Sequence, residues 1–286
     1  MSEIFVFFLH GLVYAGLLFL VSAGLTLIFG MMNVLNFAHA AMYMLGAYFA
    51  YSLLRQTGSF WLSLLLCPVF LFIIGAFIER FLLRRVHAHG HLHELLLTFG
   101  LAYVITELVK WIWGNYPLAV NIGGCLRGTV HILGIIYPVY RLFILACAIA
   151  VGSLMAAILY RMRLGIILRA SVNDSEMANA LGVNVPLVLT GVFGFGAALS
   201  GFAGVIAGPL LTTYPGMAQE ILIDAFVVIV VGGFGSLAGA VVASLAIGEL
   251  QSFGVLLFPD LSVALVYLLM AAVLIMRPSG LFGEKK

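Results

Sequence analysis

The sequence predicts an all-α polytopic membrane protein with about seven to eight membrane segments, including broken or re-entrant helices and an internal inverted repeat. Hydrophobic residues make up 64% of the 286 positions and charged residues only 8%, whereas roughly a quarter of the residues of a soluble globule are charged. Apolar runs of about 20 residues, long enough to span a hydrocarbon core, recur along the chain. They leave no room for a catalytic domain, so we expect a single transmembrane domain over residues 1–286.

The first membrane segment is predicted over residues 4–30. Three polar residues, Asn33, Asn36 and His39, then fall within about a dozen otherwise apolar positions. Polar side chains at membrane depth are costly unless they face a cavity or a partner, so we interpret residues 24–50 as a candidate pathway segment. The alternative interpretation is a loop at the membrane surface.

Three more membrane segments are predicted over residues 60–81, 95–113 and 140–160. Between the last two, residues 114–138 are rich in Gly and Pro with little charge, which is typical of a loop. Trp111, Trp113 and Tyr116 indicate an interfacial aromatic belt near residue 113.

A histidine run separates the first two of these segments, with His87, His89, His91 and His93 at alternate positions. Alternate side chains share one face of an extended backbone and could chelate a metal. No cysteine or dense carboxylate cluster accompanies them, so we favour a solvated loop and expect no metal site.

Residues 161–185 are the longest polar interruption in the second half of the chain and contain a short predicted helix. Asn173 or Asp174 can cap its first turn, Glu176 lies where the helix dipole favours an anion, and Gly182 ends it. A helix of about two turns is marginal alone in water. We interpret the segment as a cytoplasmic coupling loop that docks on a soluble partner, the alternative being an ordinary loop with one helical turn. The candidate coupling residues are Asp174, Glu176, Met177, Ala178, Leu181 and Gly182.

After this loop, a sixth segment is predicted over residues 186–211. Gly196, Ser200, Gly204 and Gly208 recur every four residues along one helix face. In lipid, small residues let helix backbones approach closely, so this stripe predicts a tight helix contact.

The distribution of basic residues predicts the orientation, because cytoplasmic loops of membrane proteins are enriched in Lys and Arg. Four basic residues fall on the outer side: Arg55, Lys110, Arg127 and Arg141. The nine assigned to the cytoplasm are Arg80, Arg84, Arg85, Arg161, Arg163, Arg169, Arg277, Lys285 and Lys286. Simple crossings after residue 186 would place Arg277 outside, so one segment must double back.

The expected reversal lies at Gly232, Gly233, Gly235 and Ser236, between two apolar flanks of 11 or 12 residues. Each flank would measure about 17 Å as a helix, roughly half of the hydrocarbon core. Irregular backbone at that depth is tolerated where it lines a cavity or is buried in protein. The alternative is one Gly-rich helix. Because residues 31–39 interrupt the first half in the same way, the two breaks suggest inverted repeats around a central pathway.

Several motifs resemble those of one transporter family. Residues 24–48, GLTLIFGMMNVLNFAHAAMYMLGAY, are similar to the N-terminal signature of the LivH-type permeases of branched-chain amino-acid ABC importers, although Ala40 stands where that family commonly has Gly. The run FVVIVVGGFGSLAGA and the terminal RPSGLFG resemble the LivH/LivM family too. Residues 176–182, EMANALG, resemble the motif with which ABC importer permeases engage their ATPases.

The resemblance implies a multi-pass permease of the bacterial inner membrane. Its partners would be a second homologous permease, two cytoplasmic ATP-binding subunits and a periplasmic substrate-binding protein, with membrane lipid around it and no nucleic acid. The chain lacks a GxxxxGK[ST] phosphate loop, so we expect ATP hydrolysis in separate subunits, and no cofactor or catalytic residue in this one. Relatives are associated with branched-chain amino acids, urea, amides or aromatic acids, and an apolar pathway does not choose among them.

An ion-coupled secondary transporter or channel for a small solute is the alternative function. Such carriers usually place carboxylates deep in the membrane, whereas Glu107, Asp224 and Glu249 are expected near segment ends. For either function, the candidate pathway residues are Asn33, Asn36, His39, Gly232, Gly233, Gly235 and Ser236.

Overall fold

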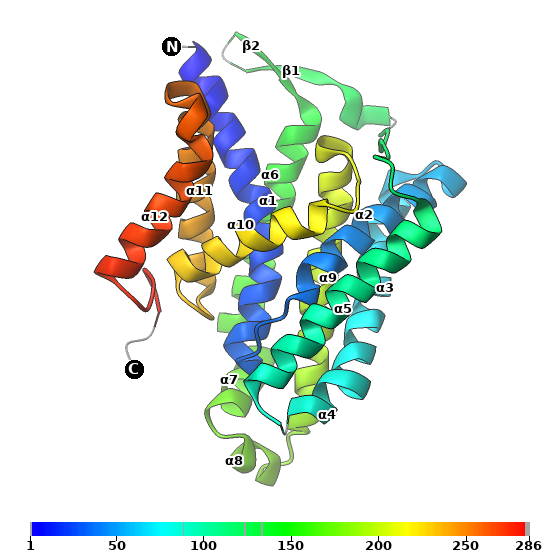
Figure 1. Ribbon diagram of the computed structural model, residues 1–286, viewed down its shortest axis with the longest axis vertical. Coiled ribbons are helices and arrows are strands. Elements are labelled where there is room, and N and C mark those ends of the chain that lie inside the picture. The colour runs from blue at the N-terminus through cyan, green and yellow to red at the C-terminus, as the bar shows by residue number, and fades with distance from the viewer. Residues whose placement is uncertain (1, 88, 123, 133, 284–286) are drawn as a thin grey trace.

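Long helices run between the two ends of the molecule in the computed structural model, which describes residues 2–87, 89–122, 124–132 and 134–283 (Figure 1). Seven of the described helical segments are long and apolar enough to cross a membrane. The long helices are α1 (Ser2–Met32), α2 (Ala38–Thr57), α3 (Phe60–Ile78), α5 (His91–Trp113), α6 (Val139–Arg161), α9 (Val185–Leu211), α11 (Leu237–Leu257) and α12 (Ser262–Met276). The predicted all-α membrane fold is confirmed.

Shorter elements connect these helices. They are the π-helical turn η1 (Glu79–Leu83), α4 (Arg84–His87), the 3-10 turn η2 (Gly124–Arg127), β1 (Thr129–Ile132), β2 (Ile135–Pro138), α7 (Arg163–Asn173), α8 (Ser175–Ala180), α10 (Met217–Gly232) and the 3-10 turn η3 (Pro259–Leu261). β1 and β2 pair antiparallel, with Thr129 opposite Pro138. The prediction of a plain loop over residues 114–138 was therefore incomplete.

Helix α9 lies at the centre of the bundle, packed against α1, α2 and α3. Its small-residue stripe makes these contacts. A methyl carbon on Gly204 would lie 1.9 Å from the Tyr43 carbonyl oxygen of α2, and one on Gly196 would lie 3.0 Å from the Gly24 carbonyl oxygen of α1. Backbones meet this closely only where side chains are absent, so the predicted tight helix contact is confirmed.

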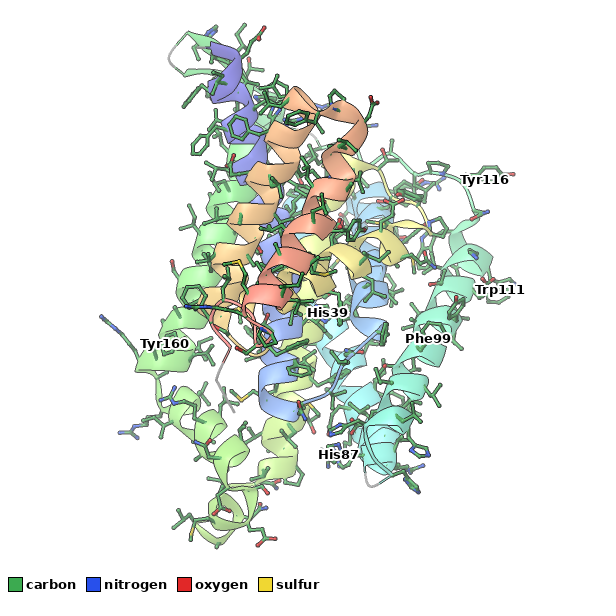
Figure 2. All side chains as sticks on the ribbon, turned by 60° about the vertical axis from the view of Figure 1, so that its left-hand side comes forward. His39, His87, Phe99, Trp111, Tyr116 and Tyr160 are labelled. Carbon is green, nitrogen blue, oxygen red and sulfur yellow. The ribbon has the colours of Figure 1, made fainter. Side chains whose placement is uncertain are left out.

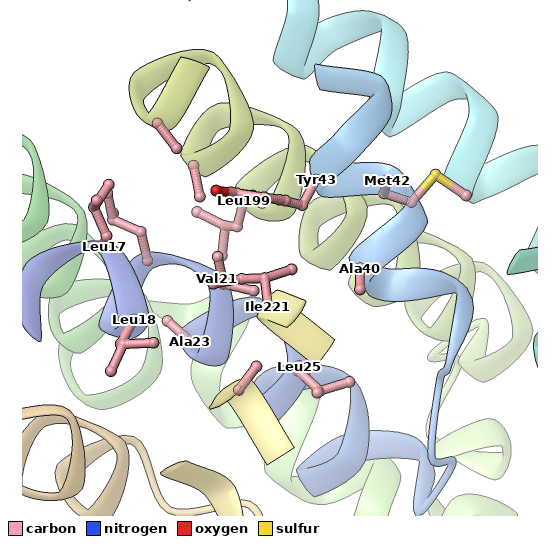
Figure 3. Packing of buried hydrophobic residues seen from close by; sticks show 14 of the residues in the cluster. Leu17, Leu18, Val21, Ala23, Leu25, Ala40, Met42, Tyr43, Leu199 and Ile221 are labelled. Atoms are coloured by element: carbon pink, nitrogen blue, oxygen red, sulfur yellow. The ribbon is translucent and has the colours of Figure 1, made fainter. Parts of the chain in front are cut away.

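The apolar core fills the space between α1, α2, α9 and α10 (Figure 3). Leu18 and Val21 of α1, Tyr43 of α2 and Leu199 of α9 are all buried in it. Helix α2, at 20 residues, is long enough to cross a membrane. Its residues from Ala38 to Tyr48 are all buried by protein.

The chain doubles back between α10 and α11, as the count of basic residues requires. In Figure 1, α10 crosses the middle of the molecule obliquely, and α11 returns toward the end that carries the N-terminus. The predicted length of the second flank was wrong, because α11 has 21 residues and extends to Leu257.

This arrangement puts α8 and the N-terminus at opposite ends of the molecule (Figure 1). The ends of α4 and α6, with Arg84, Arg85 and Arg161, lie toward the end that carries α8. Lys285 and Lys286 lie outside the described residues. The inverted repeat of the two halves stays a prediction.

Candidate functional site

The first helix break separates α1 from α2. Asn33 ends α1 in the left-handed conformation (φ 54°), and its N–H donates to the Phe29 carbonyl at 2.8 Å. Asn is one of the few residues that tolerate this conformation. Asn33 is exposed, whereas Asn36 is buried and neither atom of its side-chain amide has a partner among the described residues. Such a buried unpaired amide calls for an explanation.

His39 lies in the interior of the bundle (Figure 2), in the first turn of α2. Its Nε2 is 3.0 Å from the Val21 carbonyl oxygen of α1, while Nδ1 has no partner among the described residues. The Ser200 hydroxyl of α9 donates to the His39 carbonyl at 2.7 Å. His39 therefore joins α2 to both α1 and α9, and the interpretation of this residue as part of a surface loop is wrong.

The second break, between α10 and α11, is built from glycine. Gly233 and Gly235 have φ values of 101° and 77°, which side chains rarely adopt. A methyl carbon on Gly232 would lie 2.5 Å from the Gly239 backbone. The Ser236 hydroxyl accepts from the Gly239 N–H at 3.1 Å and so caps α11. The sequence prediction of a break at these four residues is confirmed.

The C-terminal segment completes this turn. The N–H groups of Leu281 and Phe282 donate to the Val231 and Gly232 carbonyls at 2.9 and 3.0 Å. The last carbonyls of a helix lack partners within it, and here the terminal segment supplies them. The terminal RPSGLFG run thus packs directly against the glycine-rich turn.

The two breaks meet. A methyl carbon on Gly30 would lie 2.9 Å from the Gly235 Cα, and the rings of Phe29 and Phe234 are 4.6 Å apart between centroids. A cavity of about 50 Å³ lies beside this contact. Its lining includes Thr26, Gly30, Met31, Gly235 and Leu237. The structure thus brings Gly235 to the first break, while Gly232 and Gly233 are covered by other backbone.

The short helix predicted within residues 161–185 is α8, at the end of the molecule opposite the N-terminus (Figure 1). The Asp174 carboxylate caps it by accepting from the Met177 N–H at 2.9 Å. Glu176 lies in its first turn, and Gly182 follows with a φ of 88°. The predicted start and end of the helix are confirmed.

The surface of α8 is partly apolar. Met177 is 56% and Leu181 78% exposed, although both are large hydrophobic residues. Ala178 instead is buried, and the Val183 N–H donates to its carbonyl at 3.0 Å. Met177 and Leu181 can therefore contact a partner, whereas Ala178 holds α8 on its own chain.

Helix α7 was missed in the sequence. Met162, at its N-cap position, offers no side-chain cap, so the usual start signal is absent. Gly165 allows the tight turn from α6, because a methyl carbon there would lie 2.2 Å from the Leu159 carbonyl oxygen.

A polar cluster joining η1, α4 and α9 was also missed. Glu79 is buried and accepts from the Arg84 guanidinium at 2.9 Å and from the Thr190 hydroxyl at 2.5 Å. Arg84 also donates to the Pro186 carbonyl at 2.7 Å. The π-helical turn η1 places Arg84 beside Glu79 five residues earlier, a spacing that is no usual sequence signal.

The four histidines of the run form two separate pairs in the structure. His87 and His91 contact the buried Glu94 carboxylate, the latter at 3.3 Å, while the rings of His89 and His93 lie 5.7 Å apart. Within the described residues, no group of three or more His, Cys, Asp or Glu is arranged to hold a metal ion. The run therefore closes the turn between α4 and α5.

Two carboxylates lie deeper than the sequence suggested. Asp224 is in the middle of α10 and accepts from the Tyr14 hydroxyl of α1 at 2.8 Å. Glu249 is inside α11 beside Gly11, and neither of its oxygens has a partner among the described residues. The expectation that both fall near segment ends was wrong, because α10 begins before and α11 ends after the predicted apolar flanks.

Comparisons with known proteins give a consistent result. A family model described as "Branched-chain amino acid transport system / permease component" matches residues 7–275. The permease protein BraD of a high-affinity branched-chain amino acid transport system in Pseudomonas aeruginosa is 28% identical, covering 96% of this chain and 94% of the relative.

Two further relatives give similar values. LivH of Escherichia coli K12 is 27% identical over 99% of this chain and 98% of its own, and a probable LivH of Methanocaldococcus jannaschii is 26% identical over 84% and 78%. No solved structure matches the chain significantly.

Proposed function

The chain belongs to the family of permease components of branched-chain amino acid transport systems, and on that premise we propose that it forms the membrane pathway for a branched-chain amino acid in an ATP-driven importer. Its relatives BraD and LivH are named as permease proteins of high-affinity branched-chain amino acid transport systems. The proposed assembly contains a second related permease, two cytoplasmic ATP-binding subunits and a periplasmic binding protein, in a bacterial inner membrane.

The observation that carries the proposal is α8. It lies at the end of the molecule, outside the long helices, and exposes Met177 and Leu181 (Figure 1). Exposed apolar side chains on a polar loop mark a protein contact. We assign the contact to an ATP-binding subunit, with Asp174, Glu176 and Gly182 fixing the helix that presents these side chains.

Movement of α8 would reach the pathway through α9. The Asn179 amide oxygen of α8 accepts from the Val185 N–H at the start of α9, at 3.3 Å. Helix α9 in turn packs on α1 and α2, the helices on either side of the first break. ATP-driven closure of the ATPase pair would thus shift α9 and change the contact between Gly30 and Gly235. In this proposal the two breaks gate the pathway, and Asn33, Asn36 and His39 belong to the moving part.

The decisive experiment isolates the complex from its native membrane in detergent and identifies the proteins bound to the wild-type chain and to a Glu176→Arg/Leu181→Asp variant. We expect ATPase subunits with wild type and at least a tenfold loss with the variant. The matched control is Tyr116→Asp, because Tyr116 is also 78% exposed but follows α5 at the end away from α8 (Figure 2). A wild-type chain that retains no ATPase contradicts the proposal.

Substrate choice is tested by uptake of labelled leucine, isoleucine and valine into proteoliposomes containing the whole assembly. We expect uptake to require ATP inside the vesicles and the binding protein outside. The positions of Asp224 and Glu249 favour a second candidate function, an ion-coupled transporter or channel, because carboxylates inside membrane segments are often functional. Uptake driven by an ion gradient through this chain alone would establish that alternative.

A further inference from the structure

A large apolar groove lies between α6, α7 and α9. It adjoins the small cavity beside the two helix breaks, with which it shares Leu27, Met155 and Leu159. The volume of the groove is about 340 Å³. All the residues that line it are apolar or Gly, among them Leu27 of α1, Phe72 of α3, Ile158 of α6, Ile167 of α7, and Gly191 and Phe195 of α9. Nothing in it could orient a polar solute, so its occupant is apolar.

The depth of the groove matches one leaflet of a membrane. Phe195 is ten residues beyond Val185, where α9 begins, which corresponds to about 15 Å along the helix. The hydrocarbon core of a bilayer is about 30 Å thick, so this is about half of it. The groove therefore reaches from the polar end of α9 to the middle of the membrane, a depth that a soluble partner does not enter.

Helix α7 closes the groove at its polar end. Leu164, Ile167 and Leu168 line the groove, at the i, i+3, i+4 spacing of an apolar helix face. Tyr160, at the end of α6, projects outward beside it and is 64% exposed (Figure 2), as tyrosines do at membrane interfaces. These features are those of a helix lying in the membrane surface.

The charge at this rim is positive. Arg161, Arg163 and Arg169 are exposed, and none of the three pairs with a carboxylate in the described part of the chain. The Arg169 guanidinium donates to the Leu159 carbonyl, and Leu159 itself lines the groove. Arg169 is thus held at the mouth of the groove, and Arg163 directly precedes the lining residue Leu164 in the chain.

We propose that this groove binds an acyl chain of an anionic phospholipid from the cytoplasmic leaflet, with its headgroup phosphate at Arg163 and Arg169. The groove opens on the side of the bundle formed by α6, α7 and α9 and carries no polar lining, so the proposal does not depend on the identity of the transported solute. Because α7 leads directly into α8, the lipid would brace the helix that supports the coupling contact.

The test measures lipid retained by the detergent-purified full-length chain in native mass spectrometry, after incubation with phosphatidylglycerol or phosphatidylcholine of identical acyl chains. We expect phosphatidylglycerol to be retained at least tenfold more. The Gly191→Leu variant should abolish the difference, because a side chain at Gly191 meets nothing within 4 Å and would fill the groove. Gly100→Leu is its control, since Gly100 of α5 is equally open and lies outside the groove.

A second variant tests the headgroup contact. Arg163→Gln/Arg169→Gln should lower phosphatidylglycerol retention by about tenfold or more, since each cation near an anionic surface contributes about a fivefold preference. Arg55→Gln, at the other end of the molecule, should have no such effect. Equal retention of both lipids by wild type, or an unchanged preference in Arg163→Gln/Arg169→Gln, overturns the proposal.

The wild-type chain also provides a readout that requires no substitution. Phosphatidylglycerol with a photoreactive group in its acyl chain should crosslink to residues 155–168 and 188–195. Crosslinks confined to other helices overturn the proposal, even if a groove variant fails to fold.

Discussion

At the scale of single residues, Gly233 shows how one position determines the turn between α10 and α11. Its φ of 101° lies in the region that L side chains avoid. A methyl carbon there would also come within 2.4 Å of the Gly283 nitrogen. Both the backbone conformation and the contact with the C-terminal segment therefore require glycine.

We predict that Gly233→Ala destabilises the protein by at least about 2 kcal/mol, since left-handed backbone costs an L residue about 1–2 kcal/mol and the clash adds to it. Thermal unfolding in detergent measures the loss. Gly100→Ala is the matched control, because Gly100 lies inside α5 with open space around it, and helix propensity favours Ala by about 1 kcal/mol. Equal stability of the two variants would show that the turn tolerates a side chain.

At the scale of helices and loops, α8 and the two breaks were predictable because they depend on local chemistry. The Asp cap and the Gly after the last turn of α8, and the glycines clustered between two apolar runs, can all be recognised in the sequence. Helix α7 lacks a side-chain cap, the π-helical turn η1 has no sequence signature, and β1 and β2 are only four residues each. These elements depend on tertiary contacts, so the sequence alone left them out.

The cluster of Glu79, Arg84 and Thr190 yields a prediction at this scale. Thr190→Val removes a hydroxyl donor from a buried carboxylate, and we expect a loss of about 1–3 kcal/mol in the free energy of unfolding. Lys110→Gln provides the comparison, because its pair with Glu107 is exposed and should contribute less than about 1 kcal/mol. Denaturant unfolding of both variants measures the difference, and a Thr190→Val cost as small as that of Lys110→Gln would rule out a structural role for the cluster.

At the scale of the whole molecule, the charge count predicted that one segment doubles back but could not show which surfaces meet there. Gly30 and Gly235 are about two hundred residues apart in sequence, and their contact follows from the packing of α1 against α11. The sequence therefore predicted the two helix breaks of the candidate site but not the contact between them. That Asn36 and His39 are enclosed by protein also required the fold.

The doubling back fixes which loops share a side of the membrane. In a cysteine-free background, we expect cysteines at Tyr116 and Leu261 to react with an impermeant maleimide from one side, and cysteines at Leu181 and Arg277 from the other. Each parent residue is exposed. Labelling in right-side-out and inside-out vesicles measures this. Leu181 and Arg277 reacting from opposite sides would mean that α10 and α11 do not form a re-entrant pair.

The bonds from Leu281 and Phe282 to the end of α10 set an order of events during biosynthesis. Residues 231 and 232 leave the ribosome some fifty residues before the amides that complete their hydrogen bonds. Until then two backbone carbonyls beside the second break lack these partners in a medium that penalises unpaired polar groups. A chain interrupted before residue 281 would carry every membrane segment and still be recognisable to quality-control proteases as unfinished.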